Sequence, residues 1–356
     1  MKKKNDKSSV LLNRDKSIDI ARGISILLVL AGHCQYIDLD FKIWIYSFHM
    51  PLFFFLSGMV FSYDKYPSWR MFLKNKVKKL IIPYFTLGIL IIILSILYNC
   101  YITRVYSINS FFSLLTEYFK NLLLGNRLHE NYYSFWFIPT LFVSVVLFYF
   151  VAKIIDKKKN KFLLLMVFAI ICYVIQVLLF KIVKGFYWSL DLVPIALTFI
   201  SFGYIFKNVD DKIKNKVLSF DYVYILIVVS VVLSYINYHY FGIPDLFYCK
   251  LGSYYIFILT ALLGIWIIML VSKRISFSKI MEYIGMNSFI FYFFHSTLVF
   301  PICDYILWKV GKIINIIFSN NALFWMQICI STLMLIVISF LINKYMPFLV
   351  GRRRIK

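Results

Sequence analysis

The sequence predicts an all-α integral membrane protein, a bundle of about ten transmembrane helices with both termini cytoplasmic. Three observations lead to this prediction. The 356 residues are 62% hydrophobic and only 15% charged, which is unusual for a soluble domain of this length. Apolar runs of about 18 residues or more, long enough to cross a bilayer as helices, recur along nearly the whole chain. Lys and Arg gather in the short segments between these runs, as the positive-inside rule describes.

The expected spans lie at 18–37, 42–63, 80–99, 132–152, 162–182, 188–206, 221–240, 252–271, 285–304 and 322–345. If the N-terminus is cytoplasmic, 29 of the 39 Lys and Arg fall in cytoplasmic segments and nine on the other side. An even number of spans agrees with that orientation. We therefore expect a multi-pass protein of the cell membrane, with a membrane domain at 18–345 between basic cytoplasmic tails at 1–17 and 346–356.

The formal charge of +23 is spread over short clusters between apolar runs and is not concentrated on one domain, so we expect no nucleic-acid partner. The six cysteines have no CxxC pattern and no metal spacing, so no metal site is expected. In the external segment 100–131, apolar residues recur at helical spacing. This pattern fits either an amphipathic helix on the outer surface or a helix that packs over the bundle.

The first run, "IDIARGISILLVLAGH", carries charged and titratable residues on one face. Arg22 and His33 are eleven residues apart, about 1100° of helical rotation, which is close to three full turns. Asp19 precedes Arg22 by three residues and can pair with it. An ionisable residue at mid-membrane costs about 2.5–3.5 kcal/mol, so the alignment predicts a polar interior that a substrate enters. The alternatives are a snorkelling Arg22 and a His33 held by a structural hydrogen bond.

In the second run, "YSFHMPLFFFLSG" places His49 at a depth comparable with His33, so two histidines are expected to meet in the outer half of the membrane. Pro51 can kink this helix, and Ser57 favours close helix packing. The alternative for His49 is structural packing.

In the ninth run, "GMNSFIFYFFH" places Ser288 and His295 two turns apart on one face, with Asn287 beside it. For His295 a helix–helix hydrogen bond is the alternative to a substrate site. Trp136 is either an interface anchor or part of that site. The predicted substrate-binding residues are His49, Ser57, Trp136, Asn287, Ser288 and His295.

The motifs "SIDIARGISILLVLAGH", "SFHMPLFFFLSG", "KVKKLIIPY", "FWFIPTLF" and "IGMNSFIFYFFH", in this order and spacing, resemble the acyltransferase 3 family of multi-pass O-acyltransferases, and most of all its fucose 4-O-acetylase-like branch. The resemblance runs from residue 17 to about 345. It implies acyl transfer, usually of acetyl from acetyl-CoA, to a hydroxyl of a cell-surface sugar. The essential Arg and His of the family's first span fall on Arg22 and His33.

Many members of that family carry an R-x-x-R motif before the third span that is proposed to meet acyl-CoA, and the matching residues here are Lys76 and Lys79. Lysine keeps the positive charge but lacks the bidentate fork of arginine. Together with neighbouring basic residues, the two lysines form a cytoplasmic patch suited to the phosphates of a CoA donor. They are equally explained as ordinary positive-inside residues.

We therefore expect an O-acyltransferase in which His33 is the general base, Arg22 positions the donor and Asp19 orients Arg22. Transfer is either direct or through an acyl-histidine. Acetyl-CoA or another acyl-CoA is a co-substrate, with no permanently bound cofactor. The partners are the lipid bilayer and a glycan or lipid-linked sugar. One alternative is a transporter or flippase of a glycan precursor, because intramembrane charge also suits a translocation path. Another is transfer to a non-glycan acceptor.

Overall fold

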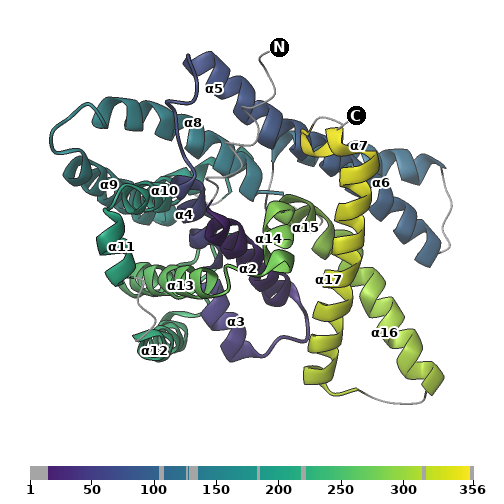
Figure 1. Ribbon diagram of the computed structural model, residues 1–356. Coiled ribbons are helices and arrows are strands. Elements are labelled where there is room, and N and C mark those ends of the chain that lie inside the picture. Colours follow the sequence, from purple (N-terminus) through teal and green to yellow (C-terminus); the bar gives the residue numbers. More distant parts are fainter. Residues whose placement is uncertain are drawn as a thin grey trace, which may run out of the picture.

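The structure, a computed structural model, describes residues 15–103, 108–125, 127, 135–182, 185–217, 222–314 and 318–352. The described residues are almost entirely helical and contain no strand beyond an isolated bridge between Asp245 and Lys250. In chain order the helices are α2 (Lys16–His33), α3 (Leu39–Tyr46), α4 (His49–Met59), α5 (Trp69–Lys76), the π-helix η1 (Val77–Ile81), α6 (Ile82–Thr103), α7 (Ile108–Leu124), α8 (Phe137–Ile155), α9 (Lys161–Ile182), the 3₁₀-helix η2 (Tyr187–Leu192), α10 (Val193–Lys207), α11 (Asp211–Val217), α12 (Val223–Phe241), α13 (Tyr254–Arg274), α14 (Lys279–Met286), α15 (Ser288–Phe294), the π-helix η4 (His295–Val299), α16 (Phe300–Ile314), α17 (Asn320–Tyr345) and the 3₁₀-helix η5 (Pro347–Val350) (Figure 1).

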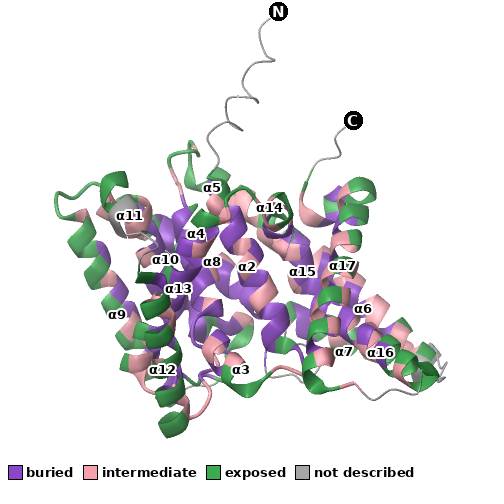
Figure 2. Ribbon diagram, turned by 60° about the horizontal axis from the view of Figure 1, so that its bottom comes forward, coloured by how far each residue is buried: buried purple, intermediate pink, exposed green. Residues whose placement is uncertain are grey.

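Eight helical stretches among the described residues are long and apolar enough to cross a membrane. They are Trp69–Tyr98, Phe137–Ile155, Lys161–Ile182, Tyr187–Lys207, Val223–Phe241, Tyr254–Arg274, Ser288–Ile314 and Asn320–Tyr345. Figure 2 shows exposed residues along α9 and α12, and Ile170, Val174 and Val228 are among them. Helices that expose apolar side chains over their length are suited to lipid. The prediction of an all-α membrane protein is confirmed, whereas the number ten stays a prediction.

The first predicted span is the helix α2, which lies in the middle of the molecule, against α4, α13 and α14 (Figure 1). It is not among the eight stretches because its 18 residues include three charged ones. Gly23 and Gly285 let the backbones of α2 and α14 touch, since a Cβ at Gly285 would meet the carbonyl oxygen of Asp19. This close contact fixes the central helix in place.

The second predicted span, 42–63, is wrong as a single helix. It is divided into α3 and α4, and Phe48 between them has non-helical backbone angles (φ −143°, ψ −18°). The cause is Pro51, whose ring would clash with the carbonyl of Ser47 in a continuous helix and which has no N–H to donate to it. As a result His49 is the first residue of α4.

The predicted span 285–304 also departs from one regular helix. Asn287 interrupts it between α14 and α15, and the five residues from His295 form the π-helical turn η4 before α16 begins. Ser288 begins α15 and His295 directly follows its last residue, so the expected two-turn spacing is kept, while the π-helical turn begins only at His295. π-helical turns of this kind are frequent at functional sites.

The two ends of the described chain lie at the same end of the molecule. Lys16 at the start of α2 is 3.8 Å from the Glu282 carboxylate on α14, and Arg352 donates a hydrogen bond to the Met286 carbonyl at the end of that helix (2.8 Å). His33 is at the opposite end of α2. Of the predicted tails, residues 1–14 and 353–356 lie outside the described residues.

The segment 100–131, which the sequence predicts to be external, contains the helix α7, which packs against α6. Leu122 is buried next to Gly88, and the Tyr84 hydroxyl donates to the Leu122 carbonyl (2.8 Å). Of the two interpretations of this segment, these contacts favour the helix that packs on the bundle.

Candidate active site

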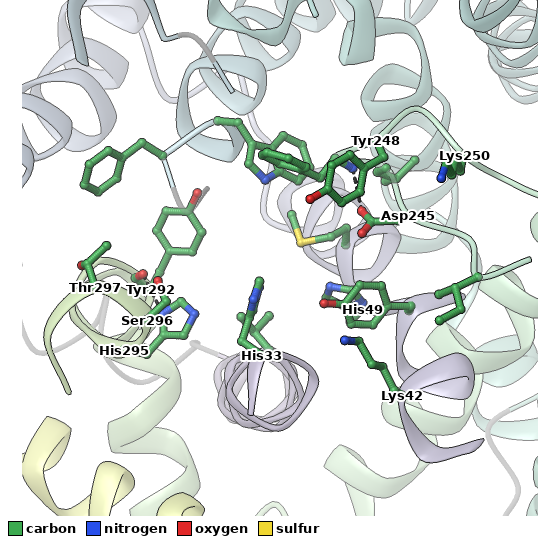
Figure 3. A pocket seen from close by; sticks show the side chains of 18 of the residues that line it. His33, Lys42, His49, Asp245, Tyr248, Lys250, Tyr292, His295, Ser296 and Thr297 are labelled. Atoms are coloured by element: carbon green, nitrogen blue, oxygen red, sulfur yellow. Dashed lines mark hydrogen bonds between the residues drawn. The ribbon is translucent and has the colours of Figure 1, made fainter. Parts of the chain in front are cut away.

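A cavity of about 890 Å³ lies beside the end of α2 at which His33 is the last helical residue. Figure 3 shows His33 between His295 and His49. The polar side chains that line the cavity are His33, Lys42, Tyr46, His49, Ser95, Tyr118, Trp136, Asp245, Tyr248, Lys250, Tyr292, His295, Ser296 and Thr297. A concave site of this size, largely aromatic and apolar with a few polar groups, is typical of small-molecule binding.

His33 is exposed to the cavity although most of α2 is buried. The helix ends because Cys34 takes an extended conformation. The Cys34 thiol donates a hydrogen bond to the Gln327 amide oxygen on α17 (2.6 Å), and the Gln327 amide nitrogen donates to Asp304 on α16 (2.7 Å). These bonds fix the position from which the His33 side chain enters the cavity.

His295 comes from the π-helical turn and is almost completely buried, with 1% of its surface exposed. Its Nδ1 is 3.1 Å from the Phe291 carbonyl oxygen and 2.8 Å from that of Tyr292. The rings of His295 and His33 have their centroids 5.2 Å apart. The imidazole next to His33 is therefore that of His295, whereas the sequence predicted His49 in this place; His49 lines the same cavity.

His49 enters the cavity from the first turn of α4. Its Nδ1 lies 2.9 Å from the Ile45 carbonyl oxygen, which can only accept, so Nδ1 carries the proton and Nε2 has the lone pair. The Tyr46 ring is close to the imidazole, with centroids 4.9 Å apart. The break between α3 and α4 therefore determines the position of His49.

The loop that joins α12 to α13 supplies Asp245, Tyr248 and Lys250 to the cavity wall. Burial raises the pKa of the Asp245 carboxyl to about 6, against the opposite effects of the Phe247 N–H, which donates to it (2.8 Å), and of the positive charges of Lys42 and Lys250. Sequence reasoning did not identify these residues, because "GIPDLFYCK" has no recognisable motif. Their role depends on a loop that folds back over the histidines.

This loop is held by a completely buried ion pair. The Arg127 guanidinium donates to both carboxylate oxygens of Asp191 (2.6 and 2.5 Å), and its Nε donates to the Phe247 carbonyl (2.8 Å). Both charged side chains are 0% exposed. A bidentate pair of this geometry is rigid, so it ties the loop to η2 and to the end of the α7 segment.

Asp19 and Arg22 form the expected pair, with 3.2 Å between the Arg22 guanidinium and the Asp19 carboxylate. Asp19 is 2% exposed. Neither residue lines the cavity, since both lie in the first two turns of α2 and His33 is in the last. Arg22 and His33 share the predicted face of α2, but Arg22 lies near the start of the helix, away from the cavity, and His33 lies at its end, beside the cavity.

The predicted donor-binding residues lie near Arg22. Lys76 is the last residue of α5 and lies within electrostatic reach of both Lys79 and Arg22. Lys79 is exposed on the π-helical turn η1, and the Lys76 ammonium stacks over Phe72, 5.2 Å from the ring centroid. These three cations form a cluster that we call the basic mouth.

Four of the predicted site residues, His33, His49, Trp136 and His295, line the cavity together. Ser57 does not, and its hydroxyl donates to the Phe53 carbonyl in its own helix (2.8 Å). Asn287 and Ser288 also lie outside it; the Asn287 amide oxygen accepts from Asn343 (2.8 Å) and Arg352 (3.2 Å). Within the described residues, no group of three His, Cys, Asp or Glu side chains is arranged to hold a metal ion.

Comparison with known proteins adds one finding. A family model described as an acyltransferase domain matches residues 15–344, which is nearly the whole chain. Neither a curated protein nor a solved structure matches this chain.

Proposed function

The chain belongs to the acyltransferase 3 family, and from this membership we propose that it is an O-acyltransferase of the fucose 4-O-acetylase-like branch. In this proposal it moves an acyl group, acetyl from acetyl-CoA, to a hydroxyl of a cell-surface or lipid-linked sugar. The observation that carries the proposal is His33, which the buried helix α2 presents to a cavity shared with two other histidines. A base exposed in a confined site is what hydroxyl acylation requires.

The donor side is the basic mouth of Arg22, Lys76 and Lys79. The clusters of Lys and Arg support a cytoplasmic position for this end of the molecule and for both termini. Acyl-CoA is cytoplasmic and carries phosphates, to which clustered cations are complementary. Asp19 holds Arg22 through the 3.2 Å ion pair and orients it toward the donor.

The acceptor side is the cavity at the other end of α2. Its volume of about 890 Å³ suits a small sugar unit. The Trp136 and Tyr248 rings offer flat apolar surfaces, and Asp245 offers a carboxylate that accepts hydrogen bonds from sugar hydroxyls. Lys42 and Lys250 add donors on the same wall.

His33 acts as the general base in the proposed reaction. Its unprotonated ring nitrogen takes the proton of the acceptor hydroxyl while the oxygen forms a bond to the thioester carbon. The carbon–sulfur bond breaks, and the CoA thiolate leaves and receives the proton from His33. The products are an O-acyl sugar and free CoA, so every atom and proton is accounted for.

The test is acyl transfer by the purified protein in lipid nanodiscs that contain lipid-linked sugar acceptors. Wild-type protein with acetyl-CoA should increase the acceptor mass by one acetyl group and release CoA. His33→Ala should abolish both effects, whereas His239→Ala, which removes an exposed histidine on α12, should not change them. Equal transfer by the His33→Ala protein would rule out the proposed base, and no acyl transfer by the wild type to any hydroxyl would rule out the proposed function.

A further inference from the structure

His33 and His295 are neighbours from different helices, and nothing in the family match assigns a role to the second ring. We propose that His295 is a positioning residue for His33: its buried Nε2 accepts a hydrogen bond from a ring N–H of His33. This bond leaves the other nitrogen of His33 unprotonated and directed into the cavity. The inference rests on the proposed function, because it refines how the proposed base is prepared for the hydroxyl.

His295 carries its ring proton on Nδ1. The turn η4 is π-helical, and the N–H of Phe300 donates to the His295 carbonyl five residues back. The imidazole Nδ1 lies between the carbonyls of Phe291 and Tyr292, at 3.1 and 2.8 Å. Carbonyl oxygens only accept, so Nδ1 must carry a proton. In the neutral ring Nε2 is then a pure acceptor.

The second ring nitrogen of His295 is Nε2. This atom is buried and has no hydrogen-bond partner among the described residues. Leaving a buried polar atom unsatisfied costs about 1–3 kcal/mol, so a partner that appears during function is expected. The three rings next to His295 are His33, Tyr292 and Phe300, with centroids at 5.2, 6.4 and 5.7 Å.

Of these three neighbours, His33 is the one suited to donate a hydrogen bond to Nε2. Phe300 has no polar hydrogen, and the Tyr292 ring is farther from His295 than the His33 ring is (6.4 against 5.2 Å), with its hydroxyl bonded to the Phe137 N–H (3.3 Å). His33 has a ring N–H, and its centroid distance brings the facing edges of the two imidazoles within reach of a hydrogen bond. The described residues include no other hydrogen-bond partner for the His33 ring, so rotation of its side chain toward Nε2 breaks no existing bond.

A histidine base is effective when a second group fixes its tautomer and ring orientation. A carboxylate usually serves in this way, but an ionised carboxylate is costly in apolar surroundings, whereas neutral imidazole avoids that cost. When His33 takes the hydroxyl proton, one of its N–H groups remains bonded to Nε2 of His295 and the other holds the new proton. That proton then passes to the CoA thiolate, and His295 stays neutral throughout.

Two substitutions test the roles of the two ring nitrogens of His295 separately. In His295→Asn the amide N–H₂ occupies the place of Nδ1 and can still donate to the Phe291 and Tyr292 carbonyls, but nothing replaces Nε2. In His295→Gln the longer side chain brings an amide oxygen toward the place of Nε2 and restores an acceptor. The measurements are kcat and KM for acetyl-CoA and acceptor, with thermal unfolding in the same nanodiscs as a folding control.

We expect His295→Asn to lower kcat about 100-fold with both KM values unchanged, and His295→Gln to be at least ten times faster than His295→Asn. A His295→Asn protein that keeps kcat within threefold of wild type would overturn the inference, and so would a Gln variant no faster than the Asn variant. Wild-type turnover is measured in parallel, so that a failure of the proposed function is recognised separately.

A measurement on the unsubstituted protein keeps the inference testable if either variant fails to fold. In protein labelled with ¹⁵N at histidine, solid-state NMR should show His295 with a protonated Nδ1 and an unprotonated Nε2. The signal of that Nε2 should shift on replacement of His33 by Ala, because its donor is removed. A protonated Nε2, or a signal indifferent to the His33 replacement, would contradict the proposed hydrogen bond.

Discussion

Arg127, which follows α7, and Asp191, in the 3₁₀-helix η2, form a two-point ion pair that is completely shielded from solvent. The Arg127 guanidinium also donates to the Phe247 carbonyl (2.8 Å). Two residues later in the same loop, Cys249 has a left-handed backbone (φ 56°), which is unusual for a residue other than glycine. The pair therefore imposes a conformation on the loop that carries Asp245, Tyr248 and Lys250 into the cavity wall.

Removing one partner of this pair should be strongly destabilising. Arg127→Met leaves the Asp191 carboxylate buried without its cation, and breaking a buried pair in this way costs about 3–5 kcal/mol. The double variant Arg127→Met with Asp191→Leu should recover most of the loss, because no charge is left unpaired. Thermal unfolding in detergent measures the stability of the single and the double variant.

The matched control for this prediction is an exposed ion pair. Lys214 and Asp211 are 3.1 Å apart, and Asp211 is 90% exposed, so Asp211→Asn should change the melting temperature little. If the single variant Arg127→Met has the same melting temperature as the wild type, the buried pair does not contribute to the stability of the fold.

A second prediction concerns the break before His49. The Phe48 ring packs against Gly264 on α13, where an added Cβ would overlap its ring atoms. Gly264→Ala should therefore displace Phe48 and, with it, His49 at the start of α4, lowering acyl transfer about tenfold. The measurement is turnover together with thermal unfolding.

Gly88→Ala on α6 is the comparison for that variant, because the new methyl group would meet only the flexible end of the Leu122 side chain. It should be tolerated with less than a twofold change in turnover. If Gly264→Ala is as active as Gly88→Ala, the position of His49 does not depend on the contact between Phe48 and Gly264.

These contacts show what sequence could and could not predict. Length and hydropathy predicted α8, α9, α12, α13 and α17, because continuous apolar runs leave a membrane helix few alternatives. Helical periodicity also predicted that Asp19 pairs with Arg22. These features are local, so the sequence around each residue was sufficient.

Other parts of the site depend on contacts distant in sequence. The neighbour of His33 is His295, 262 positions later, and its ring direction depends on a π-helical turn that hydropathy does not reveal. The cavity wall of Asp245, Tyr248 and Lys250 depends on Arg127, which bonds to the Phe247 carbonyl 120 positions later and belongs to no recognisable motif. Asn287 was expected in the substrate site, but Asn343 and Arg352 hold its side chain outside the cavity.

A third prediction concerns the basic mouth. Replacing Lys76 and Lys79 by Gln should raise KM for acetyl-CoA severalfold and leave kcat nearly unchanged, because the charges bind phosphates and do not touch the reacting carbon. The effect should shrink at high salt, where charge interactions are screened. Initial rates at varied acetyl-CoA give both constants.

Lys158→Gln, a change in the basic connection between α8 and α9, controls for a general loss of positive charge and should leave KM for acetyl-CoA unaltered. If the Lys158 variant and the Lys76/Lys79 variant raise KM equally, the basic mouth acts only as part of the general positive charge of the protein.

The last prediction is a dependence of stability on pH through Asp245. Burial raises the pKa of this carboxyl to about 6 in the folded protein, above its ordinary value near 3.8. The folded state therefore holds the proton more tightly than the unfolded state. The resulting stabilisation is complete below pH 3.8 and is lost as the pH rises through 6.

Above pH 6 the folded protein carries a poorly solvated carboxylate, which Asp245→Asn would remove. The Asn side chain still offers an oxygen to the Phe247 N–H. The melting temperature of Asp245→Asn minus that of wild type should therefore increase between pH 5 and pH 7.5 and level off above. Asp211→Asn, at an exposed site, should show no such trend. A difference that stays constant or falls over this range would mean that the Asp245 carboxylate is better solvated or better paired than its burial indicates.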